Sequence, residues 1–451
     1  MKTMWLLGMV TTSMVLTLTM TMAMADDAPT CGYTPVSTTT MCTTLPMLKI
    51  DTHGKELNPE WPNDKIAVSV SLASGTPSSP AHFASRGDVY EGAGAAKVRG
   101  QTSRANPKKS YTLDIDVSTE LLGMPKSKKW VLYAPWGDKT MLRNSLNYEL
   151  TSLQNAGWAP RTRAVELFLN ASSGYYDYKG VYLLTEKIRI GKNRVNISKS
   201  GGYIIKKDKL HAGEIPPFQV VLPSGVSLLP GQPKGEDLDA AQRHFLTTFL
   251  TEWETSLNVS AKDRAASFSR YADLDSFASY FLSTEFFQNQ DGFRHSVYFH
   301  MDKGGTLHAG PQWDLDVTYI NTFNKGSPDG WQYQAWDDVP YWWAYLMETP
   351  EFQSLVKSKW NAMVKPGGPW HYSSIATLTN SLVSQYSTPG SLDVVNASAR
   401  NYARWQVLDE WLWPGIKYRL FPDYYDYVEN NVLDWIPDRI AWITQALSKL
   451  S

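Results

Sequence analysis

The chain has 451 residues, with 43 Lys and Arg against 44 Asp and Glu, 43% hydrophobic residues and only two cysteines. This composition excludes a disordered, collagen-like or disulfide-built protein. A formal net charge of -1 without a Lys/Arg-rich run lacks the concentrated basic field that nucleic acid binding requires, so no nucleic acid partner is expected. At roughly 150 residues per domain, the length predicts two or three domains or one large two-lobed unit.

Residues 1–25 have the layout of a secretory signal peptide. Lys2 precedes an apolar stretch rich in Leu, Met, Val and Thr, and Ala23-Met24-Ala25 forms an A-x-A cleavage site. A membrane anchor is the alternative, but threonines dilute the apolar stretch too much for a span of about 20 residues. We therefore expect an exported protein, in the periplasm, in the medium or at a cell surface, without a stable membrane span after cleavage.

Both cysteines, Cys31 and Cys42, lie in a Thr/Pro-rich leader over residues 26–44. In an oxidising compartment, two cysteines this close in sequence predict a disulfide that fixes the start of the mature chain. Two thiols alone cannot complete a zinc site. We expect no part for them in the chemistry.

Short runs of alternating polarity predict a β-rich lobe over residues 45–215. Gly, Pro, Asn and Asp separate the runs, as is typical of half-buried strands. The predicted strands are 46–50, 66–72, 96–99, 110–117, 130–134, 164–169, 181–187 and 202–206. One helix interrupts them: Asp138 can cap it, Gly157 can end it, and apolar residues recur every three or four positions at Leu142, Leu146, Leu150 and Leu153.

From residue 216 to residue 451 the apolar period becomes helical, which predicts an α-rich lobe. Residues 237–257 are expected to turn Phe245, Phe249 and Trp253 to one face. A hairpin follows a second helix, and the segments predicted to be regular are 274–287, 297–300 with 307–313, and 437–450. The fold class predicted is therefore α+β, a β-rich lobe followed by an α-rich one.

Two acidic residues flank the hairpin. Asp291 comes just before its first strand and Asp314 just after its second, and an antiparallel hairpin brings its two open ends together. Such carboxylates either hold a divalent cation or divide acid and base roles, whereas an arbitrary pair of aspartates more often caps turns. The order helix, Asp, hairpin, Asp is also that of a protein-kinase lobe, where one Asp accepts the substrate proton and the other holds Mg²⁺.

Eight segments together carry a family resemblance, although each is weak by itself. In chain order they are Leu45-Pro46 with Ile50-Asp51-Thr52, Val98-Arg99-Gly100-Gln101-Thr102-Ser103, Pro107-Lys108-Lys109-Ser110-Tyr111, Asp138-Lys139-Thr140-Met141-Leu142-Arg143-Asn144, Gly180-Val181-Tyr182-Leu183-Leu184-Thr185-Glu186-Lys187-Ile188, Gly201-Gly202-Tyr203, Asn289-Gln290-Asp291 and Trp313-Asp314-Leu315-Asp316. From about Leu45 to Tyr319 the sequence resembles the spore coat protein H (CotH) kinase family, atypical secreted protein kinases with a two-lobed kinase-like fold.

The resemblance implies roles for the acidic residues. Asp291 matches the catalytic Asp, which orients and deprotonates an incoming Ser or Thr hydroxyl, and Asp314 matches the Mg²⁺-binding position of the W-D-x-D motif. Asp316 is either an additional or indirect ligand or a turn cap. Asp138, Arg143 and Asn144 are expected to be structural, as a helix cap and an ion pair between the lobes.

Three residues of the β-rich lobe are candidates for the nucleotide. Lys109 can reach phosphate oxygens as a point charge, whereas Lys108 should face the other side of the strand and be solvated, unless the register shifts by one. Arg99 can bind phosphate bidentately, although its loop is equally read as a plain turn. Glu186 is a candidate to position the lysine, or it pairs with Arg189.

One position departs from the kinase pattern. A metal-binding Asn follows the catalytic Asp by five residues in ordinary kinases, but position 296 is Ser here. A Ser hydroxyl can ligate Mg²⁺ more weakly, and His295 beside it either supplies a ligand that shifts the preference toward Mn²⁺ or is an ordinary loop histidine.

The leading interpretation is an exported kinase-like enzyme that moves the γ-phosphoryl of ATP, with Mg²⁺ or Mn²⁺, to Ser or Thr of secreted or surface proteins. One alternative is a surface adhesion or assembly protein that keeps the fold without turnover. Another is a carbohydrate-active enzyme with Asp291 and Asp314 as its carboxylate pair. The tryptophans of the second half are expected to be core rather than a sugar-binding face: Trp331, Trp336, Trp342, Trp343, Trp360 and Trp370.

Overall fold

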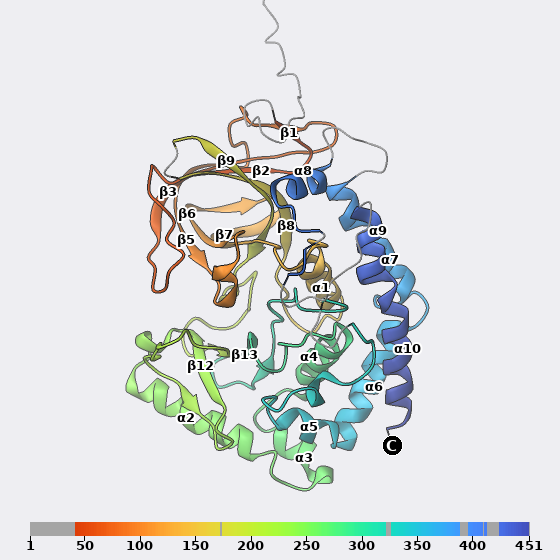
Figure 1. Ribbon diagram of the computed structural model, residues 1–451. Helices are drawn as coiled ribbons and strands as arrows, with labels where there is room; N and C mark the ends of the chain where they lie inside the picture. Colours follow the sequence, from red (N-terminus) through yellow and green to blue (C-terminus); the bar gives the residue numbers. More distant parts are fainter. Residues whose placement is uncertain are drawn as a thin grey trace, which may run out of the picture.

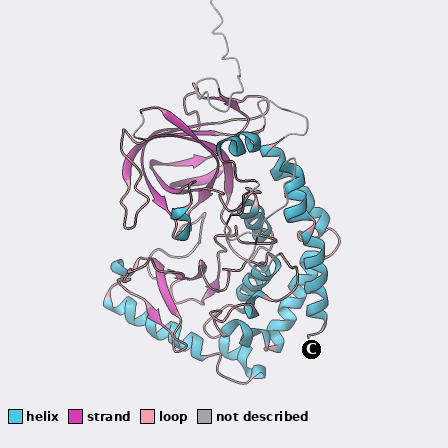
Figure 2. Ribbon diagram, in the orientation of Figure 1, coloured by secondary structure: helices cyan, strands magenta, loops and turns pink. Residues whose placement is uncertain are grey.

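The computed structural model of the protein describes residues 41–171, 174–321, 326–387, 396–408, 410–412 and 424–450. The predicted signal peptide and Cys31 lie outside these residues, and Cys42 is disulfide-bonded. None of the helices in the described ranges combines the length and apolar character that a membrane crossing requires. The architecture is mixed α+β, with the strands gathered in the first half and most helices in the second (Figure 2).

Seven strands of the first half close into a barrel in the order β2-β3-β5-β6-β7-β9-β8 (Figure 1). All neighbours are antiparallel except β2 and β8, whose parallel pairing closes the barrel. Their bounds are Met47–Asp51 (β2), Ile66–Ala73 (β3), Tyr90–Arg99 (β5), Ser110–Leu121 (β6), Met124–Tyr133 (β7), Thr162–Asn170 (β8) and Tyr176–Glu186 (β9). The alternating runs in the sequence therefore predicted the strands correctly, but not their closure.

The two faces of the barrel differ in character. Its interior is an apolar core that includes Val98, Leu113, Trp130 and Leu184. Because side chains alternate along a strand, the residues between these point outward. In register, Lys97 pairs with Thr112, Thr112 with Val131, and Val131 with Thr185, so one row of outward residues crosses four strands.

The helix predicted after β7 is present as α1, Arg143–Ser152. Asp138 accepts hydrogen bonds from the backbone N–H of Arg143 at 2.9 Å and from its guanidinium at 2.5 Å, and both side chains are buried. Arg143 also donates to the carbonyls of Thr318 and Asn431, each at 3.2 Å. Leu142 is the N-cap residue, but Asp138 caps the helix by accepting from the first helical N–H. The Asp138–Arg143 ion pair is local rather than between the lobes, and the bonds of Arg143 to the two carbonyls join the distant segments.

A second sheet lies below the barrel in the view of Figure 1, next to α2. It has the order β11-β12-β10-β13-β14, with bounds Val220–Val221 (β11), Ser227–Gln232 (β12), Tyr203–Lys207 (β10), Val297–Met301 (β13) and His308–Ala309 (β14). The predicted hairpin is β13 and β14, and β13 pairs with β10 of the first half. A small two-stranded sheet joins Cys42–Thr43 (β1) and Ala81–His82 (β4).

The helices form one continuous core with α1 and the second sheet. They are Ala240–Thr255 (α2), Ala261–Phe268 (α3), Leu274–Phe286 (α4), Trp342–Met347 (α5), Pro350–Val364 (α6), Tyr372–Tyr386 (α7), Ala397–Arg404 (α8), Tyr424–Val428 (α9) and Trp435–Ser448 (α10). Trp342, Trp343, Trp360 and Trp370 are at most 1% exposed, as expected of core. Of the residues predicted on the buried face of α2, Trp253 is buried and Phe249 is partly buried against the core, whereas Phe245 is 39% exposed. Leu246 and Leu250 complete the buried face.

Helix α8 lies against the barrel, although it comes late in the sequence (Figure 1). Arg400 binds Glu166 through two hydrogen bonds of 2.9 Å, and Asn401 accepts from the Lys108 ammonium at 2.8 Å. Asn401 also accepts from the Val181 N–H at 3.1 Å, so α8 attaches the C-terminal part of the chain to β8, to β9 and to the segment before β6.

Candidate active site

The hairpin brings the two predicted acidic segments together. Asp291 follows α4 and Asp314 follows β14, and between their loops the Tyr319 N–H donates to the Phe287 carbonyl at 2.8 Å. The Gln290 N–H likewise reaches the Val317 carbonyl at 3.4 Å. The two carboxylates are close enough that the charge of Asp291 contributes to raising the pKa of Asp314.

The backbone conformation of Asp314 indicates a functional role rather than a packing role. Its φ of 61° lies in the left-handed region, and Ser296 across the hairpin has φ 54°. Such conformations are uncommon outside glycine and cluster at functional sites. The Asp314 carboxylate reaches solvent, yet the walls of the cleft surround it closely, and this desolvation is the main cause that raises its pKa to about 6.

Ser296 lies between two carboxylates. Its N–H donates to Asp208 at 3.3 Å, and its hydroxyl is 3.5 Å from Asp314, at the limit of a hydrogen bond. Asp208 follows β10, and its charge also raises the pKa of Asp314. No local pattern selects Asp208, because it joins the site only through the pairing of β10 with β13.

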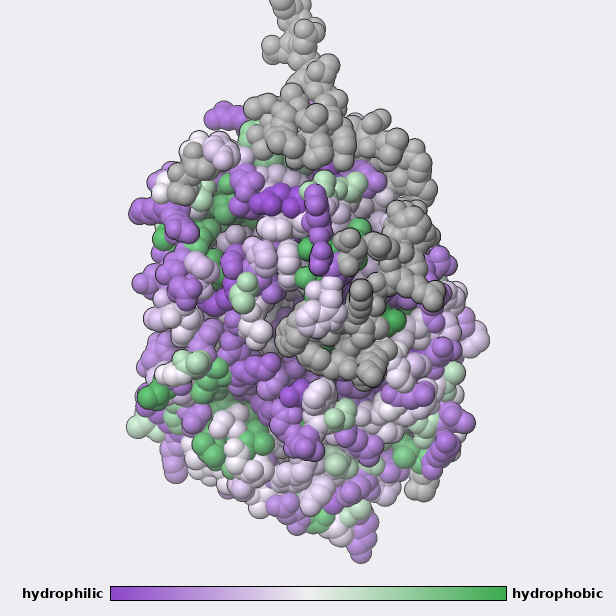
Figure 3. All heavy atoms as spheres, in the orientation of Figure 1, coloured by the Kyte–Doolittle hydropathy of each residue, from purple (hydrophilic) through white to green (hydrophobic). Residues whose placement is uncertain are grey.

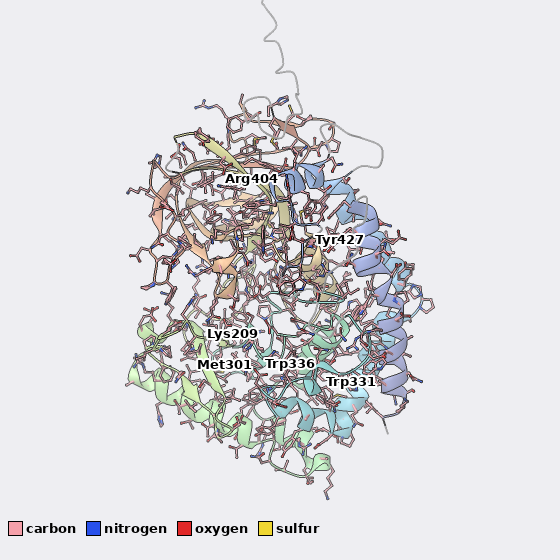
Figure 4. All side chains as sticks on the ribbon, in the orientation of Figure 1. Lys209, Met301, Trp331, Trp336, Arg404 and Tyr427 are labelled. Carbon is pink, nitrogen blue, oxygen red and sulfur yellow. The ribbon has the colours of Figure 1, made fainter. Side chains whose placement is uncertain are left out.

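The surroundings of Asp291 leave its carboxylate accessible. Its side chain is 29% exposed, and its backbone is fixed by bonds to Asn289, Arg294 and His295. The Arg294 guanidinium is 3.8 Å from the Asp291 carboxylate but forms a closer ion pair of 2.5 Å with Asp338. It also packs on the Trp336 ring. His295 is neutral at pH 7, because desolvation lowers its pKa to about 4. Figure 4 labels Trp336 and Lys209, which lie below the barrel in this view.

Arg99 faces these acids from the outer side of the barrel. Its guanidinium packs over the Trp313 ring at 5.4 Å, and its positive charge lowers the pKa of Asp314. A cleft of about 230 Å³ of empty space, open solvent included, lies here, lined by Arg99, Val131, Tyr133, Asn144, Tyr148, Thr185, Trp313 and Asp314. In Figure 3, hydrophilic residues gather across the middle of the face shown, between the barrel and the helices.

Asp316 is placed behind Asp314 rather than beside it. Its carboxylate accepts a hydrogen bond of 3.0 Å from Tyr133, and burial together with the charge of Asp314 raises its pKa to about 8. Its carbonyl accepts from Asn321 at 2.8 Å. These contacts fit an indirect role, in which Asp316 fixes the loop that carries Asp314.

The structure differs from the expectations for Lys108, Glu186 and Lys109. Lys108 is not solvated but 2% exposed, since its ammonium donates to the Val181 carbonyl at 2.6 Å and to Asn401. Glu186 does not position Lys109, because Arg161 at 2.9 Å and Arg194 at 2.6 Å take its carboxylate. Lys109 donates to the Arg104 carbonyl at 2.6 Å and does not line the cleft.

The sequence reasoning passed over Lys187, which follows Glu186 in the segment Thr185-Glu186-Lys187-Ile188. Desolvation lowers its pKa to about 8, and the positive charge of Arg99 adds to this effect. The alternation of β9 could have found it, because Thr185 lines the cleft and the residue two positions on points to the same side.

The oxygen donors at this site fit a magnesium ion whose coordination is completed by phosphate oxygens. In the described part of the chain, no group of three His, Cys, Asp or Glu residues is close enough to form a metal cage. Mg²⁺ is commonly bound through one or two carboxylates together with substrate phosphates and water rather than by an all-protein cage. Asp314, with Ser296 and Asp208 nearby, provides such a partial set.

Comparison with known families agrees with this geometry. Residues 96–367, more than half of the chain, match the family described as CotH kinase protein. The matched range contains β6 to β14, both loops of the hairpin and all the candidate residues. No curated protein matches the sequence.

Proposed function

The chain belongs to the CotH kinase family, and on this basis we propose that it is an exported enzyme that transfers the γ-phosphoryl of ATP to Ser or Thr of secreted or surface proteins. The observation that carries the proposal is the arrangement of charge in the cleft. Asp291 and Asp314 come from the two open ends of one hairpin, and Arg99 faces them from the barrel. This arrangement suits an anionic substrate held between cations and a metal-binding carboxylate.

Asp291 acts as the base in this proposal. Its accessible carboxylate accepts the proton of the acceptor hydroxyl while the oxygen forms a bond to the γ-phosphorus. The bond between the γ-phosphorus and the bridging oxygen breaks, and ADP leaves with the electron pair. Asn289 supports the loop by accepting a hydrogen bond of 3.2 Å from the Asp291 N–H.

Asp314 and Ser296 would hold Mg²⁺ or Mn²⁺, which when bound would neutralise charge on the phosphates. Tyr148 supports Asp314 from α1, because its hydroxyl accepts a hydrogen bond of 3.2 Å from the Asp314 N–H. Trp313 packs between Tyr148 and the Arg99 guanidinium, which orders the cation at the cleft. Positioning and charge compensation therefore supply most of the catalysis, as phosphoryl transfer requires.

Export is the second half of the proposal, and it rests on the signal-like segment 1–25. An exported kinase needs acceptor proteins that share its compartment. Candidate acceptors are therefore proteins co-secreted with this chain or displayed on the same surface.

The test compares the mature protein with Asp291→Asn and Asp314→Asn, using γ-labelled ATP with Mg²⁺ or Mn²⁺ and casein or co-secreted proteins. We expect each variant to lose transfer by at least about 10³-fold with an unchanged melting temperature. Asp116→Asn, an exposed barrel position, is the matched control and should keep full activity. Wild-type transfer no greater than that of Asp291→Asn would reject the proposal. ATP binding without transfer would instead support the adhesion or assembly alternative, which the Ser296 departure allows.

A further inference from the structure

The outer face of the barrel carries more cations than the proposed mechanism has used. Lys65, Lys97, Lys129, Lys187 and Arg99 lie on or beside the outward rows of β3, β5, β7 and β9. The charges of Arg99, Lys65 and Lys129 lower the pKa of Lys187, and the charge of Lys65 lowers that of Lys97. Asp114 is the carboxylate among them, paired with Lys129 in register. Such an excess of positive charge on one face needs an explanation, because like charges repel.

Most of these cations already have partners. Asp114 accepts from both Lys65 and Lys129 in short ion pairs. The Lys97 ammonium donates to the Asn63 carbonyl at 3.1 Å. Within the described residues, only Arg99 and Lys187 of this group make no hydrogen bond or ion pair to protein.

Lys187 is held where an ammonium is costly without a partner. Lys187 is partly buried just after β9. It lies two residues beyond Thr185, which lines the cleft. Desolvation is the largest cause of its lowered pKa of about 8, and Arg99 and Lys65 act in the same direction. A desolvated cation next to other cations is strongly favoured to bind an anion.

Its position also joins the two sides of the cleft. Arg99 lines the cleft together with Asp314, and its charge also lowers the pKa of Lys187, so the guanidinium is near both the ammonium and the carboxylate that would hold the metal. A polyphosphate that reaches from Lys187 past Arg99 would end at Asp314. Arg binds phosphate as a fork and Lys as a point charge, so the two cations complement each other.

We propose that Lys187, together with Arg99 and in place of Lys109, is the lysine that binds the nucleotide phosphates. The inference rests on the proposed function, since it names the residue that anchors the substrate of that reaction. The Lys109 ammonium is already bound by the Arg104 carbonyl at 2.6 Å, whereas the Lys187 ammonium makes no hydrogen bond or ion pair to any described residue.

The direct test measures binding of ATP with Mg²⁺ to the mature protein by calorimetry. Lys187→Met should raise Kd by roughly 10- to 100-fold, as loss of a charged hydrogen bond predicts, and Lys187→Arg should restore most of the affinity. Lys192→Met, an exposed lysine five residues on, is the matched control and should bind as wild type does. Unchanged affinity in Lys187→Met, or a loss in Lys109→Met alone, would overturn the inference.

Inorganic tripolyphosphate as a second probe separates this inference from the proposed function. Wild type that binds tripolyphosphate through Lys187 but does not transfer phosphate from ATP would reject the kinase function and keep the phosphate site. Wild type that transfers phosphate while Lys187→Met retains the same KM for ATP would keep the function and reject the site.

A measurement on the wild-type protein covers the case in which a variant does not fold. Pyridoxal 5′-phosphate forms an imine with a lysine amine by loss of water, and borohydride reduces it to a stable adduct. Because its pKa is lowered, Lys187 should be labelled ahead of Lys192, and ATP should protect it. Peptide mapping that finds no ATP-protected adduct at Lys187 would contradict the assignment.

Discussion

Charged groups are partly or fully desolvated both at the junction between α8 and the barrel and in the cleft below the barrel. The two regions differ in how many protein partners these groups have. At the junction, the Glu166 carboxylate receives two bonds from Arg400 and one of 2.6 Å from Tyr178. In the cleft, Asp314 has the Ser296 hydroxyl at 3.5 Å, and Lys187 makes no bond to any described residue.

The difference separates structural charge from functional charge. A buried carboxylate whose oxygens are all occupied by protein donors can hold two segments together but has no capacity left for a ligand. Carboxylates and cations left incompletely partnered cost stability, and their pKa values move away from the ordinary ones, as those of Asp314 and Lys187 do. The unfilled bonding capacity, more than the residue type, marks the cleft as the site.

The largest expected effect comes from removing the arginine that binds Glu166 at the junction between α8 and the barrel. Arg400→Met leaves the Glu166 carboxylate buried without its guanidinium, which should lower the free energy of unfolding by about 3–5 kcal/mol in urea denaturation. ATP transfer per folded molecule should stay within about twofold. Arg404→Met, on the same helix but 36% exposed, should cost less than about 1 kcal/mol. Equal losses in the two variants would show that burial does not separate them.

His300 in the hairpin is a third kind of group, a titratable side chain that is buried in its neutral form. Its contribution to stability can be tested by changing the pH. Burial is the main cause that lowers the pKa of His300 to about 4, with His308 adding to it and the bond to the Gly310 carbonyl opposing it. The unfolded pKa is about 6.5, so the stability that His300 contributes is complete above that pH and is lost as the pH falls through 4.

Between pH 7 and pH 4, wild type should therefore lose about 3 kcal/mol more unfolding free energy than His300→Gln, which stays neutral. Thermal unfolding at a series of pH values measures the difference. His53→Gln, an exposed histidine, should follow the wild-type curve. Parallel curves for wild type and His300→Gln would show that the imidazole is not desolvated.

Local sequence patterns predicted a large part of this fold because their causes are local. Alternation marks the strands of the barrel, and the Asp138 cap marks α1. The approach of Asp291 and Asp314 was also predictable, because a hairpin places its two ends together whatever surrounds it.

The missed features all depend on distant segments. Lys108 is buried because Asn401, 293 residues away, accepts a hydrogen bond from its ammonium, and no local pattern contains that information. Asp208 enters the site through the pairing of β10 with β13, and Lys187 lies near it because it follows β9 two residues beyond Thr185, which closure of the barrel places at the cleft. Sequence could name the charged residues, but only the packing of the chain shows which of them remain without a partner.

A smaller effect is expected at Asp316, where the comparison is made within one loop. Asp316→Asn keeps an oxygen that can accept from Tyr133, so the loop and Asp314 should stay in place. Transfer should therefore fall by less than about tenfold, against at least about 10³-fold for Asp314→Asn. Steady-state kinetics with Mg²⁺ measures both. Equal losses would make Asp316 a direct ligand.

The smallest effect is expected from Ser296→Asn, which adds bonding capacity to the cleft instead of removing it. Asn tolerates the left-handed φ of 54° at this position better than Ser does. The free energy of unfolding should therefore rise by a few tenths of a kcal/mol, and the melting temperature should rise slightly. The longer amide can also place an oxygen beside Asp314, and the apparent affinity for Mg²⁺ should then increase a few-fold. Ser296→Ala keeps the fold but removes the oxygen, so it should lower the metal affinity and leave ATP-independent stability unchanged within about 0.5 kcal/mol. If the Asn and Ala variants have the same metal dependence as wild type, position 296 does not contribute to the metal site, and Asp208 becomes the second protein group to test beside Asp314.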